Sequence, residues 1–291
     1  MSQRLLTPLI IGAALGLGAP NFVRPAFAAP PKPAKAAKPE PKAPPKAKLD
    51  LEKQQKALES GDETKVLEAL DEIKKKNDDA GVVLVELLLT RGASPSVLVR
   101  AIETLGAFAK PTSGKELVPY TQHRNADIRH AALRALILTK SDAAADALKR
   151  ALRSPDPAQR SIAARGLGEL NVRSAVSDLF TVLAREVPEA AGALGQLCVG
   201  DECERFFDLL GKIPFDVMEA GIVPILLRTQ KDVSDDLKLK LIERLRRMAT
   251  KPASDLIQTA IATFPPDGSP KVKAGLEASL KGHRVWPPEA K

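Results

Sequence analysis

The chain has 291 residues, of which 44% are hydrophobic but only 3% aromatic, and its formal net charge is +8. A core built mainly from Leu, Ala, Val and Ile favours closely packed helices and argues against a β-sandwich, which draws on aromatic and β-branched residues. Almost all of the surplus charge lies in residues 1–48. The remainder is close to neutral at +1, so it is not expected to bind nucleic acid.

The first 28 residues have the three-part order of a secretory signal peptide. A positively charged start precedes an apolar run over 5–17, and Ala26-Phe27-Ala28 fits the pattern for cleavage between Ala28 and Ala29. The apolar run is shorter than the roughly 20 residues of a membrane span. The sequence predicts an exported protein, periplasmic or extracellular. An uncleaved membrane anchor and a buried N-terminal helix are the alternatives.

Residues 29–48 form a segment rich in Pro, Lys and Ala, with seven prolines, six lysines and one acid. Each proline lacks an N–H and fixes φ, so neither a helix nor a sheet is expected. We predict a disordered, extended tether, roughly 60 Å long at about 3.1 Å per residue. It is interpreted as an inert spacer, or as a polycation that contacts anionic components of the cell envelope.

From Leu49 onward, apolar residues recur at three- and four-residue steps, which predicts amphipathic helices. A polar leading helix is expected over 49–60, and a last helix over 269–281. After the leading helix, helix pairs are predicted at 62–92, 95–122, 125–153, 156–185, 187–212, 215–249 and 251–282, and the last helix belongs to the final pair. Pro224 should break or kink a helix of the sixth pair. The predicted helical domain spans 49–285, and 286–291 form a tail.

The helical pattern repeats with a period of 31 residues. Ala131–Leu136 returns as Ile162–Leu167, and Arg129, Leu148 and Leu152 find their counterparts at Arg160, Leu179 and Leu183. A single helix pair cannot bury its apolar stripes, whereas a stack of pairs can. The sequence therefore predicts an all-α fold, an α-solenoid of about six or seven stacked antiparallel helix pairs.

One stretch carries a family resemblance. Ser154-Pro155-Asp156-Pro157, followed by Ile162-Ala163-Ala164-Arg165-Gly166-Leu167-Gly168-Glu169-Leu170, resembles a HEAT repeat, in particular the short HEAT-like type named after phycobilisome lyases. The resemblance covers 94–185 well and 186–282 loosely. It implies that Asp127 with Arg129, and Asp156 with Arg160, tie one repeat to the next. The alternative is that these residues are solvated surface charges.

The two cysteines, Cys198 and Cys203, bracket the predicted turn of the fifth pair. In an oxidising compartment a disulfide would clamp this turn. Two buried thiols, one on each helix, are the alternative. A metal site would need more ligands than the neighbouring sequence offers.

No catalytic motif is present: the chain lacks a Gly-x-Ser-x-Gly elbow, a Walker-type loop, a His-Glu-x-x-His pair and a dinucleotide glycine pattern. Of the three histidines, His130 lies on a predicted helix, and the equivalent position of the next repeat is Ser161. This favours a surface or inter-repeat role for His130. The sequence predicts no catalytic residue, no cofactor and no metal site.

These features favour a non-catalytic protein-interaction scaffold. Stacked helix pairs present an elongated concave face, usually lined by the second helix of each pair. Lys149, Arg150 and Arg153 would lie there and contact a protein or peptide partner, with solvated surface charge as the alternative. We expect a monomer or one part of a complex. The competing hypotheses are an enzyme-assisting, lyase-related protein and a nucleic-acid-binding one.

Overall fold

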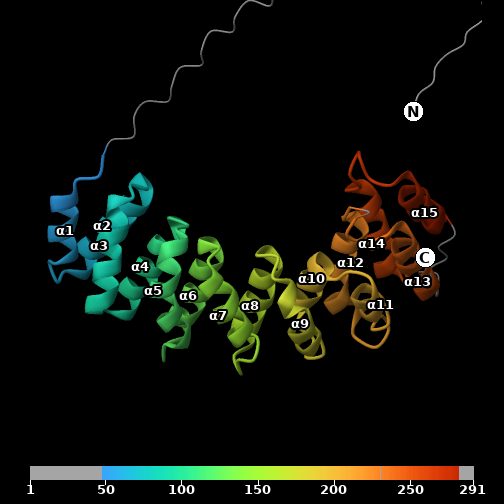
Figure 1. The fold of residues 1–291 in the computed structure, drawn as a ribbon, viewed down its shortest axis with the longest axis horizontal. Coiled ribbons are helices and arrows are strands. Elements are labelled where there is room, and N and C mark those ends of the chain that lie inside the picture. The colour runs from blue at the N-terminus through green and yellow to red at the C-terminus, as the bar shows by residue number, and fades with distance from the viewer. Residues whose placement is uncertain (1–47, 230, 282–291) are drawn as a thin grey trace, which may run out of the picture. The chain divides into compact units, whose positions relative to one another are not determined.

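The computed structural model describes residues 48–229 and 231–281, and in this part of the chain the regular structure is helical (Figure 1). The predicted signal peptide, the tether up to residue 47 and the C-terminal tail lie outside the described residues. The helices are α1 (Leu51–Leu58), α2 (Glu63–Lys76), α3 (Ala80–Arg91), α4 (Pro95–Ala107), α5 (Gly114–Leu117), α6 (Ala126–Thr139), α7 (Asp142–Ala151), α8 (Pro157–Glu169), α9 (Val176–Leu183), α10 (Pro188–Leu197), α11 (Asp201–Phe207), α12 (Phe215–Leu227), α13 (Asp235–Met248), α14 (Lys251–Ala262) and α15 (Pro270–Lys281). Short 3-10 turns, η1 (Pro111–Ser113), η2 (Val118–Gln122) and η3 (Arg173–Ala175), flank α5 and precede α9.

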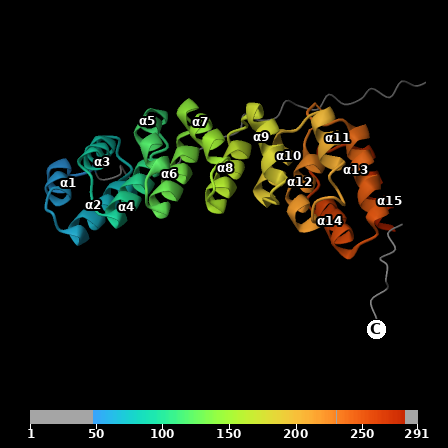
Figure 2. The same ribbon diagram turned by 90° about the horizontal axis from the view of Figure 1, so that it is seen from below.

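The helices form two layers, which Figure 2 shows on opposite sides of the row. The even-numbered helices α2 to α14 are the first helices of the pairs, and each contacts the next even-numbered one. The odd-numbered helices are the second helices, and α1 leads the row. The buried core lies between the layers and consists of two clusters, one from Leu49 to Ala147 and the other from Leu133 to Leu276. The fold is the predicted α-solenoid, and the helix pairs follow the predicted boundaries closely.

Local sequence signals explain several helix starts. Asp62, Asn125 and Asp156 lie just before α2, α6 and α8, and each side chain accepts a hydrogen bond from a backbone N–H of the first turn. This satisfies donors that the helix itself cannot pair. Pro157 takes the first position of α8, where its missing N–H costs nothing. The chain reverses within a few residues after each helix, which keeps successive helices antiparallel.

Small residues set the spacing within the first layer. A Cβ on Gly106 of α4 would lie 2.7 Å from the Cβ of Ala135 on α6, and one on Gly195 of α10 would lie 2.8 Å from the Cα of Gly221 on α12. At these crossings the helix backbones approach so closely that only glycine fits. First-layer helices are therefore packed more tightly than those of the second layer.

Pro224 does not break its helix. The last turn of α12 continues past it to Leu227, so of the two predicted outcomes, a break or a kink, the break does not occur. Proline removes one backbone hydrogen bond. The buried neighbours Ile222, Ile225 and Leu226 hold the turn against the core, and their burial outweighs that loss.

Candidate functional site

A cleft of about 470 Å³ opens at the edge of the stack, where the chain passes from second helices back to first helices. We call it the α6–α8 cleft. Its walls come from three segments: the end of η2 and the loop before α6, the C-terminal turn of α7, and the loop that leads into α8. It gathers Arg129 and Asp156, which the sequence predicts to link repeats, and Arg150, which it predicts to bind a partner. It also contains Arg124, which the sequence analysis missed.

Arg129 and Asp156 join two consecutive repeats at one wall of the cleft. The Arg129 guanidinium donates to Asp156 Oδ2 at 3.2 Å and to the carbonyls of His123 and Arg124, each at 3.0 Å. His130 Nε2 lies 2.8 Å from the same Asp156 oxygen. The other oxygen, Oδ1, accepts from the backbone N–H of Ala158 at 2.9 Å and so caps α8. One carboxylate thus both caps α8 and anchors α6, the first helix of the preceding pair.

The environment of Asp156 strongly favours its charged form. Partial burial, with the side chain 20% exposed, raises the pKa of this carboxyl. The hydrogen bonds from His130, Arg129 and the Gln159 backbone outweigh the burial, and the pKa falls from 3.8 to about 2. Asp156 is therefore an anion whose charge is already matched by its own neighbours.

The second predicted pair of linking residues behaves differently. Arg160 donates to the carbonyls of Ser154 and Pro155, each at 2.9 Å, as Arg129 does one repeat earlier. However, its Nε is buried without a partner among the described residues. The next first helix, α10, begins after Val187, which has no capping side chain. Val187 stands 31 positions after Asp156 and has no carboxylate, so Arg160 lacks the partner that Arg129 has.

Asp127 does not take the expected linking role. Asn125, two residues earlier, caps α6, and the Asp127 side chain is exposed in the first turn with no hydrogen bond among the described residues. Asn125 is the residue that stands 31 positions before Asp156. The prediction for Asp127 is therefore wrong, because the capping position is set by where the helix starts.

The three candidate partner-binding residues lie at the C-terminal end of α7 or just after it. Lys149 pairs with Asp146 at 3.1 Å and Arg153 with Asp178 at 3.2 Å. Arg150 is exposed, lines the α6–α8 cleft and has no ion-pair partner in the described part of the chain. Of the three, Arg150 alone presents an uncompensated charge to a ligand in that cleft.

These residues belong to the second layer, and here the expected geometry needs correction. Close backbone approaches occur between first helices, at α4–α6, α8–α10 and α10–α12. The layer with the closer helices is the shorter one, so the stack bends locally toward it. Between α4 and α12 the concave side is therefore lined by first helices, and the expectation that second helices line it is wrong there.

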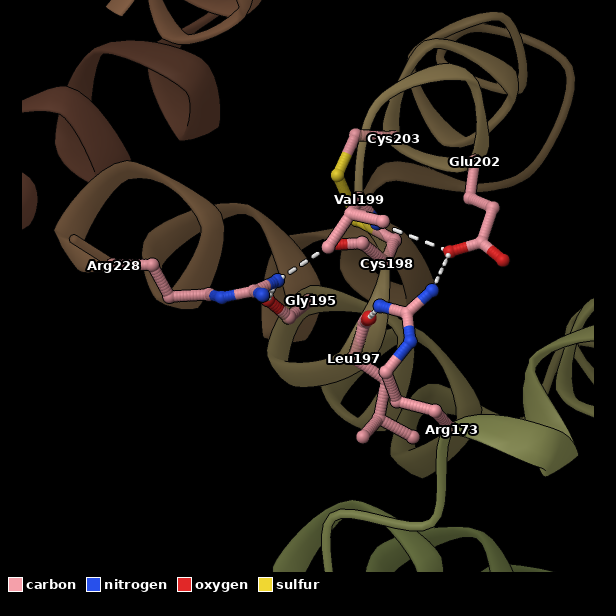
Figure 3. The surroundings of a disulfide bond; sticks show 8 residues. All are labelled: Arg173, Gly195, Leu197, Cys198, Val199, Glu202, Cys203 and Arg228. Atoms are coloured by element: carbon pink, nitrogen blue, oxygen red, sulfur yellow. Dashed lines mark hydrogen bonds and ion pairs between the residues drawn. A yellow bond between two sulfur atoms is a disulfide. The ribbon is translucent and has the colours of Figure 1, made fainter. Parts of the chain in front are cut away.

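Cys198 and Cys203 are joined by a disulfide that clamps the turn between α10 and α11, with a Cα–Cα distance of 5.2 Å (Figure 3). Both residues are fully buried. Arg173, from the preceding repeat, donates to the Leu197 carbonyl and, at 2.9 Å, to Glu202. The turn is thus fixed covalently and also held by the repeat before it.

The following repeat also forms hydrogen bonds to this turn. Arg228, just after α12, donates to the carbonyls of Cys198 at 2.6 Å and Gly195 at 3.3 Å (Figure 3). Lys238 of α13 is 3% exposed and donates to the carbonyl of Arg228. Burial lowers the pKa of both cations. No sequence motif marked Arg173 or Arg228, because their partners lie 24 to 33 positions away along the chain.

Within residues 48–229 and 231–281, no three His, Cys, Asp or Glu side chains are grouped so that they could hold a metal ion. His123 accepts the Asn125 N–H through Nδ1 at 3.1 Å, and His130 faces Asp156, while His283 lies outside the described residues. No helix in this part of the chain is long and apolar enough to cross a membrane.

Comparison with known proteins identifies the repeat type. Residues 81–164, from α3 into α8, match the family model of HEAT repeats. This segment is therefore similar to HEAT repeats, as the resemblance implied. No curated protein sequence matches it.

Solved structures with a similar arrangement share little sequence with this chain. The complex of CpcE and CpcF of phycocyanin lyase from Nostoc sp. is 15% identical, with a TM-score of 0.44 over 86% of this chain and 99% of that chain. An engineered protein is 17% identical, with a TM-score of 0.42 over 80% of this chain and 67% of that one. A designed armadillo repeat protein is 15% identical, with a TM-score of 0.38 over 81% of this chain and 100% of the designed chain.

Proposed function

We propose that this HEAT-repeat protein is an exported interaction scaffold that acts by binding a protein partner along its layer of first helices, not by catalysis. The observation that carries the proposal is the repeated, solvent-facing surface of that layer. Helix pairs in register bury their apolar stripes against each other and leave one face of each first helix open over successive repeats. Such a surface suits an extended partner that contacts several repeats at once.

The exposed side chains of this face recur at equivalent positions. Arg134 on α6 and Arg165 on α8 are 31 residues apart and both exposed. Leu138, one turn beyond Arg134, is 51% exposed although it is apolar. Farther along, a groove of about 580 Å³ runs between α12 and α14 and includes the apolar residues Val223 and Leu256. Charged positions and apolar positions together are what protein interfaces require.

Export is part of the same proposal. It is supported by the signal-peptide order of residues 1–28 and by the Cys198–Cys203 disulfide, since disulfides persist in oxidising compartments. The intact mass of the protein from fractionated cells tests it. We expect a species beginning at Ala29 in the soluble envelope or in the medium. A full-length species in the cytosol would refute export.

Photo-crosslinking in living cells tests the binding face. A photoreactive amino acid is placed at Arg134 or Arg165 in the first layer, or at Ser177 as a matched exposed position on α9 in the second layer. We expect one discrete crosslinked protein from both first-layer positions and none from Ser177. Equal crosslinking from all three positions, or none from any, would refute the proposed face.

A further inference from the structure

The α6–α8 cleft carries two positive charges that the fold does not use. Arg124 and Arg150 both line it, both are exposed, and neither has an ion-pair partner within the described residues. The third arginine of the cleft, Arg129, is neutralised by Asp156, which also faces His130. The charges of Arg129 and Asp156 therefore cancel, and the net positive charge of the cleft comes from the guanidinium groups of Arg124 and Arg150.

The repeat register shows that the architecture does not require these two arginines. Arg129 returns as Arg160 because it ties down the loop before its own helix. In contrast, 31 residues after Arg124 stands Pro155, and 31 residues after Arg150 stands Thr181. Arg124 and Arg150 thus occur at these register positions in a single repeat and make no ion pair with the rest of the described stack. Their joint presence in one cleft needs an explanation other than packing.

We propose that the α6–α8 cleft binds an acidic segment of the protein partner, with Arg124 and Arg150 holding carboxylate side chains of that segment. This inference rests on the proposed function and specifies the partner's chemistry. A guanidinium presents several N–H donors in a planar fork that matches a carboxylate, and such charge-assisted hydrogen bonds are stronger than neutral ones.

The rest of the cleft favours a peptide over a small inorganic anion. A tight phosphate site is usually built from free backbone N–H groups at a helix start. Here those of Ala158 and Gln159 already donate to Asp156 Oδ1, at 2.9 and 3.4 Å. The floor contains Ala147 and Ala151, which offer methyl groups to the aliphatic part of a peptide side chain.

The chain's own tether is not a suitable occupant. Residues 29–48 contain six lysines and one acid, so they carry the same sign of charge as the cleft. Like charges repel at the short distances within a cleft. The matching ligand is a segment rich in Asp or Glu from another protein.

Fluorescence anisotropy with labelled octaglutamate tests the proposal on the purified protein. The variant carrying Arg124→Gln and Arg150→Gln should bind about tenfold or more weakly than wild type, because two charge-assisted contacts are lost. The matched control is Arg185→Gln, which removes an exposed arginine that lies outside the cleft and has no described partner. It should bind like wild type. Charge reversal, Arg124→Glu with Arg150→Glu, should abolish octaglutamate binding and create binding of labelled octalysine.

Three results would overturn the inference. The double Gln variant could bind as tightly as wild type, the Arg185→Gln control could lose as much affinity as the double variant, or inorganic phosphate at equal concentration could displace the peptide as well as unlabelled octaglutamate does. Crosslinking from Arg134 in cells separates the two proposals. If it persists while octaglutamate binding is insensitive to the cleft variants, the acidic-segment inference fails and the scaffold proposal stands. If no crosslink forms, the scaffold proposal fails.

Discussion

Replacing Asp156 should weaken the stack more than any other single change of a carboxylate described here. The side chain caps α8 and accepts hydrogen bonds from Arg129 and His130, whose side chains are 22% and 18% exposed. Loss of an N-cap costs about 1 kcal/mol. Leaving partly buried donors unpaired adds about 1–3 kcal/mol. We expect Asp156→Ala to lower the free energy of unfolding by about 2–4 kcal/mol.

Asp156→Asn separates the two roles of this residue. Asparagine caps helices as well as aspartate does, so the cap is kept while the charge is lost. The expected loss is about 1–2 kcal/mol. Asp127→Asn is the matched control, since Asp127 is exposed in the first turn of α6 without a described side-chain partner, and it should change stability by less than about 0.5 kcal/mol. Chemical denaturation followed by circular dichroism measures all three variants.

The pH dependence gives an independent check. Folding lowers the pKa of Asp156 from 3.8 to about 2, so the charged form stabilises the fold above pH 3.8, and this stabilisation is lost as the pH falls toward 2. The shift corresponds to at most about 2.5 kcal/mol, which solvent screening reduces to about 1–2 kcal/mol. The stability difference between wild type and Asp156→Asn should therefore shrink across this range.

The reasoning is refuted if Asp156→Ala costs no more than Asp127→Asn, or if the difference between wild type and Asp156→Asn does not change with pH. A double-mutant cycle with Arg129→Met gives the direct contribution of the pair. We expect a coupling energy of about 1–2 kcal/mol. A coupling near zero would mean that the cap alone accounts for the effect.

Two further predictions concern the middle of the stack. Gly195→Ala should lower the free energy of unfolding by about 1–3 kcal/mol, because the added Cβ would lie 2.8 Å from the Cα of Gly221. The control is Gly192→Ala, whose Cβ would have its nearest atom at 3.7 Å, and it should be neutral or stabilising. Equal effects of the two substitutions in thermal denaturation would contradict the close approach. Replacing Cys198 and Cys203 together by Ala should cost about 2 kcal/mol, since the short loop they close gains entropy in the unfolded chain. An unchanged denaturation midpoint would show that the disulfide does not constrain the turn.

The sequence by itself determined the helices and their pairing. Apolar spacing, caps such as Asp156 with Pro157, and the 31-residue period are local signals, and a helix satisfies its backbone hydrogen bonds within its own segment. The boundaries predicted from these signals agree with the structure over α1 to α15. The helix continues past Pro224 instead of breaking there, because burial of its neighbours, a property of the whole stack, outweighs one lost hydrogen bond.

Only the tertiary structure decided which side chains meet. Arg129 reaches Asp156 across 27 positions, and Arg124 shares a cleft with Arg150 because two loops and a helix end converge there. The direction of the local bend was likewise absent from the sequence pattern, since it depends on which layer lets backbones touch at Gly195 and Gly221. A helical period fixes the face on which a residue lies. The distance to a residue in the next repeat depends on how the helices pack, and that packing sums many weak contacts that no short motif records.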